Sequence, residues 1–253
     1  MAASSAPLNS GSSRKYRKSL LYFMIFLLVF LVSTTVLMVY PNSSTSLIKS
    51  PVKTLKIWCI SYGVLELCGY SLLCGMESDF DHSSASKRSR ASSTIINNVS
   101  AKVVSSIKYG LLIFFSSIAF HIIAVLYGAP FTETVTETAT FGVLLTTIVT
   151  IPTLCVLGTN AECYSRLIGS RRPHAGVESC LAYIVFFSLL GAWLGAFPIP
   201  LDWDRPWQKW PVSCCIGALS GHTLGLVASV IHSARGLEES SETFFSRGKS
   251  KNF

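Results

Sequence analysis

The chain has 253 residues, of which 50% are hydrophobic and only 13% are charged, and its mean hydropathy of +0.48 indicates membrane spans. Its net charge of +8 is distributed in short basic pieces between apolar runs. Basic flanks of membrane spans explain this pattern better than nucleic-acid binding does. The eight cysteines have no metal-ligand spacing and fall mainly in or beside apolar runs, which disfavours a metal site or a disulfide framework. We therefore expect no cofactor.

Six apolar segments predict an all-α membrane protein, a six-helix transmembrane bundle within residues 20–231. The predicted spans are residues 20–40, 57–73, 109–127, 141–157, 180–197 and 211–231. Residues 1–19 are rich in Ser, Ala and Gly and end in four basic residues, so they are predicted to form a disordered basic cytosolic tail. Residues 232–253 are predicted to form a polar cytosolic tail.

The first two predicted spans differ in how easily they enter a membrane. The first has no charge, and its 14 Leu, Ile, Phe and Val residues contribute roughly −6 kcal/mol to insertion. The second has Glu66 at its centre, and the cost of this acid roughly cancels its seven strongly apolar residues, about −3 kcal/mol. This helix should therefore need neighbours around Glu66. Two roles stay open for Glu66, a protonated or hydrogen-bonded residue in the bundle, and a contact to a substrate or partner.

The following segments alternate between polar loops and apolar spans. Residues 77–108 are polar and are predicted to form a solvated loop with a Ser/Lys/Arg cluster. His121 lies near the end of the third span, where a lone histidine is expected to be a hydrogen-bonded packing residue. The fourth span contains Pro152, which predicts a kink that neighbouring helices can accommodate.

The distribution of basic residues predicts the orientation of the chain. Of the 21 Lys and Arg residues, 16 lie in the two tails and in the second and fourth loops, and 5 lie in the other three loops. Since cytoplasmic segments carry the excess of basic residues, both termini are predicted to be cytosolic. Lys249 and Lys251 then match the K-x-K-x-x pattern of cytosolic signals for retrieval to the endoplasmic reticulum.

The stretch from Gly191 to Gly225 is unusual in composition. Four prolines interrupt residues 198–211, hereafter the elbow, and exclude one continuous helix. Small residues four apart let helix backbones approach closely, as in G-x-x-x-G pairs. The glycines with this spacing are Gly191 and Gly195 before the elbow, and Gly217, Gly221 and Gly225 after it. We expect them to pack the fifth and sixth spans against each other or against a partner helix.

The elbow also holds an Asp-x-Asp pair, Asp202 and Asp204. Such a pair can hold a divalent cation against the phosphates of a nucleotide, but Arg205 beside it offers local ion pairing instead, and so short a motif arises easily by chance. We predict no metal site. Trp203, Trp207 and Trp210 are expected to form an aromatic belt at the membrane boundary, with their indole N–H groups in the wet layer. Together with Asp202, Asp204 and Arg205, they are also candidate residues for binding a partner.

Two short motifs suggest an alternative function. Arg172-Pro173 and Ser220-Gly221-His222 resemble elements of membrane lipid phosphatases, in which a histidine attacks phosphorus. The third segment of that site, with Arg, His and Asp, is not found, and the two motifs fall at different predicted depths. His222 is therefore predicted to be a helix-packing or hydrogen-bonding residue.

From Gly191 to Cys214, the elbow and its flanks resemble the PIG-F family, and the predicted six-span core is compatible with that family. The resemblance implies a non-catalytic subunit in the membrane of the endoplasmic reticulum that binds and stabilises the ethanolamine-phosphate transferases of glycosylphosphatidylinositol (GPI) assembly. It implies PIG-O-type and PIG-G-type catalytic partners and contact with membrane lipid. It leaves open whether the chain also contacts the GPI precursor. The alternative is a membrane lipid phosphatase or phosphotransferase acting alone.

Overall fold

The computed structural model describes residues 10–39, 46–82, 93–159, 177–201 and 203–249, together with residues 162, 164, 165 and 167. Every regular element within these ranges is helical. The elements are α1 (Ser10–Val39), α2 (Pro51–His82), α3 (Ser93–Leu126), α4 (Val135–Leu145), the π-helical turn η1 (Thr146–Thr150), α5 (Ile151–Leu157), α7 (Val177–Leu194), the 3-10 turn η2 (Pro206–Gln208) and α8 (Val212–Lys249). The all-α prediction is confirmed for this part of the chain.

Five helical stretches among the described residues are long and apolar enough to cross a membrane. They are Lys15–Met38, Val103–Leu126, Val135–Leu157, Val177–Leu194 and Val212–Leu237. The chain is therefore a helical membrane protein with several spans. α2, which carries the acid of the second predicted span, is outside this set. It nevertheless packs against α1, α4 and α5.

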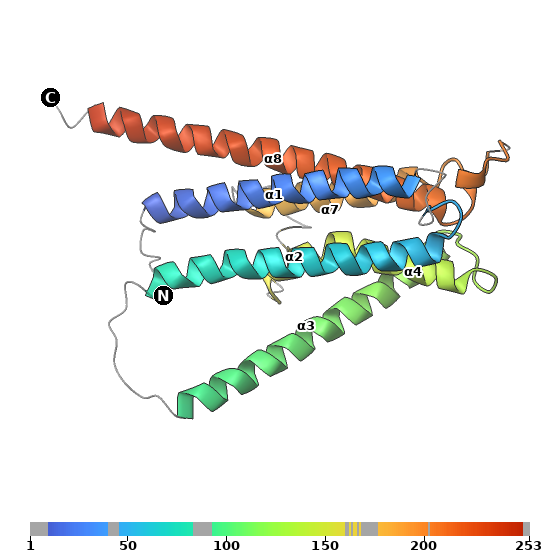
Figure 1. The fold of residues 1–253 in the computed structure, drawn as a ribbon, viewed down its shortest axis with the longest axis horizontal. Helices are drawn as coiled ribbons and strands as arrows, with labels where there is room; N and C mark the ends of the chain where they lie inside the picture. The colour runs from blue at the N-terminus through green and yellow to red at the C-terminus, as the bar shows by residue number, and fades with distance from the viewer. Residues whose placement is uncertain are drawn as a thin grey trace.

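The helices form an elongated bundle in which successive long helices run in opposite directions (Figure 1). Residues 46–50, residues 127–134 and the elbow lie together at the right-hand end of the view. The start of α1 and the end of α8 lie at the other end, where the Arg17 guanidinium donates a hydrogen bond to the Gly236 carbonyl at 3.4 Å. The two ends of the described chain thus share one side of the bundle.

The helix formed by α4, η1 and α5 occupies the centre of the bundle. Within its most apolar 18-residue segment, 72% of the helix is buried, whereas only 6% of the corresponding segment of α3 is buried. Its many threonines fit this position because their hydroxyls bond to backbone carbonyls four residues earlier, at 2.9 Å from Thr138 to Thr134 and from Thr146 to Gly142. Pro152 follows η1, as expected where a missing N–H disturbs the regular helix.

Several helices extend beyond the apolar ranges that were predicted as spans. α1 begins at Ser10, so the predicted disordered tail is helical over its second half. α2 and α3 reach to His82 and Ser93, which shortens the predicted loop, and α8 continues to Lys249. The central helix begins at residue 135 instead of 141. Hydrophobicity marks the membrane-embedded part, whereas extending an existing helix costs far less than nucleating one, so polar ends stay helical.

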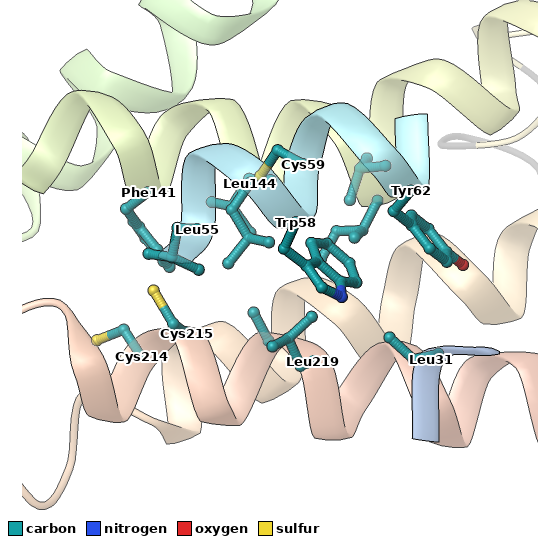
Figure 2. Packing of buried hydrophobic residues seen from close by; sticks show 14 of the residues in the cluster. Leu31, Leu55, Trp58, Cys59, Tyr62, Phe141, Leu144, Cys214, Cys215 and Leu219 are labelled. Atoms are coloured by element: carbon teal, nitrogen blue, oxygen red, sulfur yellow. The ribbon is translucent and has the colours of Figure 1, made fainter. Parts of the chain in front are cut away.

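The core lies where α1, α2, α4 and α8 meet. Trp58 and Tyr62 of α2 stack with ring centroids 4.7 Å apart, and the Trp58 indole donates to the Thr34 hydroxyl of α1 at 3.0 Å. Figure 2 shows these rings beside Leu31 of α1 and Leu219 of α8. Three cysteines of this cluster, Cys59, Cys214 and Cys215, are buried thiols. They pack as small apolar residues, as predicted.

α3 is the least enclosed helix and diverges from α2 toward its N-terminal end (Figure 1). It is held mainly by α4 and η1. The close contact is made at Gly142, where an added Cβ would lie 3.1 Å from the backbone nitrogen of His121. His121 is thus part of the α3–α4 packing, but its Nδ1 has no hydrogen-bond partner among the described residues, so the predicted hydrogen-bonding role stays a prediction.

Candidate functional site

α7 and α8 pack together through their glycines. A Cβ on Gly217 would lie 2.9 Å from the Cα of Gly195, and a Cβ on Gly221 would lie 3.0 Å from the Cα of Gly191. Carbon atoms in normal contact are about 3.5–4.0 Å apart, so only glycine permits this approach. Gly225 continues the seam, since a Cβ there would lie 2.8 Å from the Cα of Ile184. Of the two contacts expected for these glycines, the structure contains the one between the fifth and sixth predicted spans.

An apolar groove of about 420 Å³ runs along the outer side of this seam, and we call it the seam groove. Its floor is the glycine contact itself, and exposed side chains such as Leu194 and Leu224 form its rims. It is lined by Phe187, Leu190, Gly191, Leu194, Gly195, Pro198, Trp207, Ser213, Ile216, Gly217, Ser220, Gly221 and Leu224. The groove therefore joins the predicted glycine faces to one tryptophan of the elbow.

The elbow is folded around Gln208, which sequence reasoning missed. The buried Gln208 amide donates to the carbonyls of Pro198 at 2.7 Å and Leu201 at 2.8 Å, and its Oε1 accepts from the Arg205 backbone N–H at 2.7 Å. Three hydrogen bonds from one side chain close the turn, because the prolines leave few backbone donors to do so. Only the presence of an amide in a stretch of Trp and Pro could have signalled this role.

The three tryptophans of the elbow do not form a uniform belt. Trp203 is exposed and meets Trp207 edge to face, which agrees with a position at the membrane boundary. Trp210 instead turns inward, where its indole N–H donates to the Thr138 hydroxyl at 3.0 Å and its ring meets Phe141. The prediction of a wet indole N–H was wrong for Trp210, because this partly buried indole donates to a buried hydroxyl of α4.

The Asp-x-Asp pair is only partly described. Asp202 lies outside the described residues, while Asp204 and Arg205 are exposed. Asp204 has a φ of 47°, in the left-handed region that aspartate tolerates better than most residues. No group of three metal-ligating side chains occurs among the residues that the structure describes. Lys251 and the side chain of Lys249 also lie outside the described part.

A chain of hydrogen bonds crosses the interior at His222. Ser188 donates to the Ile184 carbonyl at 2.6 Å, so its oxygen accepts from His222 Nδ1 at 3.1 Å. His222 Nε2 then accepts from the Tyr62 hydroxyl at 2.9 Å. A neutral imidazole satisfies every contact in this chain, and α2, α7 and α8 are joined by it. The prediction of a hydrogen-bonding role for His222 is confirmed, whereas its partners Tyr62 and Ser188 carried no sequence signal.

Glu66 is 1% exposed, and its Oε2 has no hydrogen-bond partner among the described residues. It lies four residues from both Tyr62 and Tyr70, on the same face of α2. The expectation that neighbouring helices enclose Glu66 is confirmed. Whether Glu66 also contacts a substrate or partner stays a prediction.

The fold therefore defines a helical membrane protein with several spans, whose α7–α8 pair is built on glycines and ends in a folded elbow. The family model described as "GPI biosynthesis protein family Pig-F" matches residues 28–230, and the chain belongs to this family. The resemblance seen in the elbow is thereby confirmed over most of the chain. No solved structure matches the chain.

Curated relatives are similar to about half of the chain. A mouse protein named "GPI ethanolamine phosphate transferase, stabilizing subunit" is 46% identical over 133 residues, and its human counterpart is 44% identical over 133 residues. Each alignment covers 53% of this chain and 61% of the relative. A Yarrowia lipolytica protein named "Glycosylphosphatidylinositol anchor biosynthesis protein 11" is 35% identical over 120 residues, which cover 47% of this chain and 52% of that protein.

Proposed function

We propose that this chain is a non-catalytic membrane subunit that binds and stabilises the ethanolamine-phosphate transferases of GPI-anchor biosynthesis, which transfer ethanolamine phosphate to GPI mannose. The observation that carries the proposal is the family match over residues 28–230, together with relatives named as the stabilising subunit of that transferase. The catalytic partners are PIG-O-type and PIG-G-type subunits.

The seam groove supplies a physical basis for binding a partner within the membrane. In lipid the hydrophobic effect does not drive helices together, so association depends on close packing and on interhelical hydrogen bonds. The groove offers a floor without side chains, apolar rims and the exposed hydroxyl of Ser220. A transmembrane helix of the transferase fits this chemistry, and the elbow would contact the same partner outside the membrane.

The charge distribution and the family support an orientation and a location for the chain. We propose that α2 crosses the membrane in addition to the five long apolar stretches, which gives six spans. Both termini are then in the cytosol, and the elbow faces the lumen of the endoplasmic reticulum. α2 enters the membrane because its acid is enclosed by the other helices. Lys249 and Lys251 would then act as a cytosolic retrieval signal.

The alternative function, a phosphatase or phosphotransferase acting alone, has less support. A nucleophilic histidine needs an unshared nitrogen facing an open site, but His222 is 1% exposed and Tyr62 donates to its Nε2. The interior chain of hydrogen bonds therefore supports a role in holding helices together.

Filling the seam groove tests the proposal. Ser220→Phe would place a ring in the groove without entering the glycine contact, so the chain should insert normally but lose its transferase in pull-downs from detergent-solubilised membranes. Val104→Phe, at an exposed apolar position of α3 away from this groove, is the matched control and should retain the partner. Equal recovery of the transferase with both variants would contradict docking at the groove, and phosphotransfer by the purified chain alone would contradict the non-catalytic role.

A further inference from the structure

A second groove, of about 560 Å³, lies where the starts of α2 and α4 meet, at the same end of the bundle as the elbow (Figure 1). We call it the lysine groove. It is lined by Ser50, Pro51, Val52, Lys53, Lys56, Ile57 and Glu137. Unlike the seam groove, it combines charged side chains with an apolar wall.

The charges of the lysine groove are separated and not paired with one another. Lys53 and Lys56 are three residues apart on α2, so their ammonium groups lie on one face, and both residues are exposed. Glu137 enters from the first turn of α4 and is partly buried. Within the described part of the chain no ion pair joins Glu137 to either lysine. Two cations and one anion around a common space fit a ligand that carries both signs of charge.

The surface below the charges is apolar and faces outward. Ile57, Ile60 and Val64 continue down the exposed side of α2, with exposed fractions of 52%, 68% and 54%. Because α2 begins at Pro51, the lysines lie within its first two turns, at one end of this apolar strip. A polar end followed by an apolar strip is the arrangement that a membrane phospholipid requires, with its headgroup at the charges and an acyl chain along the helix.

We propose that the lysine groove binds the phosphoethanolamine headgroup of a membrane phospholipid. The phosphate contacts Lys53 and Lys56, and the primary ammonium donates hydrogen bonds to Glu137. The binding itself does not depend on the proposed function. The use of such a site, to hold an ethanolamine phospholipid beside the transferase, does rest on it.

The residues of the groove discriminate among headgroups. A choline headgroup has no N–H to donate and is usually bound by aromatic cages, but none of the seven lining residues is aromatic. A serine headgroup carries a carboxylate on the same carbon as its ammonium, which would bring like charge to Glu137. A glycerol headgroup offers no cation to this carboxylate. Ethanolamine is the headgroup that satisfies all three charged side chains.

The test is lipid binding by the detergent-purified full chain, measured by native mass spectrometry with phospholipids of identical acyl chains. The ethanolamine lipid should bind about tenfold more tightly than the choline, serine or glycerol lipids, because each of these leaves Glu137 without a hydrogen-bond donor or brings a like charge to it. Soluble phosphoethanolamine, which has no acyl chain, should bind at least about tenfold more weakly than the ethanolamine lipid. Equal binding of the ethanolamine and choline lipids, or preference for the serine lipid, would overturn the proposal.

Variants assign the contacts. Glu137→Gln should abolish the preference for ethanolamine over choline, and Lys56→Gln should weaken binding of every phospholipid. Glu133→Gln and Lys49→Gln change exposed charges outside the lining and should alter neither property. Retention of the preference in Glu137→Gln would refute the assigned role of Glu137. Co-purification of the transferase, measured with the same variants, is a separate readout, so loss of the partner and loss of lipid preference can be told apart.

Discussion

The glycine seam gives the sharpest prediction for stability, because one added carbon suffices to test it. In Gly221→Ala, the new Cβ would lie 3.0 Å from the Cα of Gly191 and closer still to the Phe187 carbonyl oxygen. Normal carbon contacts are about 3.5–4.0 Å, so the Gly191 contact alone requires α7 and α8 to separate by roughly 0.5–1 Å, and the carbonyl oxygen requires more. No rotamer change can relieve the contact, since both obstructing groups are backbone atoms. Overpacking of this kind costs about 1–3 kcal/mol.

The assay is thermal unfolding of the purified chain in detergent or nanodiscs. For a protein of this size, a loss of 1 kcal/mol lowers the Tm by roughly 2–4 °C, so Gly221→Ala should be measurably less stable. Gly110→Ala is the matched control, because a Cβ at Gly110 of α3 would meet nothing within 4 Å. Alanine is the better helix former, so this control should keep or raise the Tm. Equal Tm values for the two variants would refute the argument that the seam depends on glycine.

Three other predictions concern the hydrogen bond between Tyr62 and His222, the membrane orientation and the retrieval signal. Tyr62→Phe leaves the buried His222 Nε2 without its donor and should cost about 1–2 kcal/mol in thermal unfolding, whereas Tyr22→Phe on the exposed side of α1 should be neutral. Glycosylation acceptors inserted into the elbow should be modified and those in either tail should not; modification of the C-terminal tail would overturn the orientation. Replacing Lys249 and Lys251 with serine should let part of the protein leave the endoplasmic reticulum while the partner stays bound, and unchanged localisation would show that assembly retains it.

Features that depend on residue size or on long apolar runs were predictable from the sequence. A close helix contact at Gly217, Gly221 and Gly225 was anticipated because a spacing of four places them on one face, although the sequence left open whether the neighbour is α7 or a partner helix. The burial of Glu66 was anticipated because an isolated acid cannot remain facing lipid. Both inferences need only the helix period and the properties of the membrane.

Features that depend on which side chains meet across the bundle could not be predicted. Nothing about Tyr62 or Ser188 alone indicates that His222 lies between them, because they come from three helices whose contacts the sequence does not state. Trp210 was assigned to the membrane boundary by its residue type, yet its indole N–H donates to the hydroxyl of Thr138 on another helix. The lysine groove was missed for the same reason, since Lys53 and Glu137 become neighbours only through the packing of α2 on α4.

In the proposed function, this chain stabilises its transferase without taking part in the chemistry. The most direct measurement is the abundance of the transferase and its rate of ethanolamine-phosphate transfer in membranes from cells without the chain, and again after its re-expression. Without the chain, transferase abundance and total transfer should fall together, so that the rate per remaining transferase molecule is unchanged. Normal transferase abundance with abolished transfer would contradict it, because the chain would then contribute to the reaction itself.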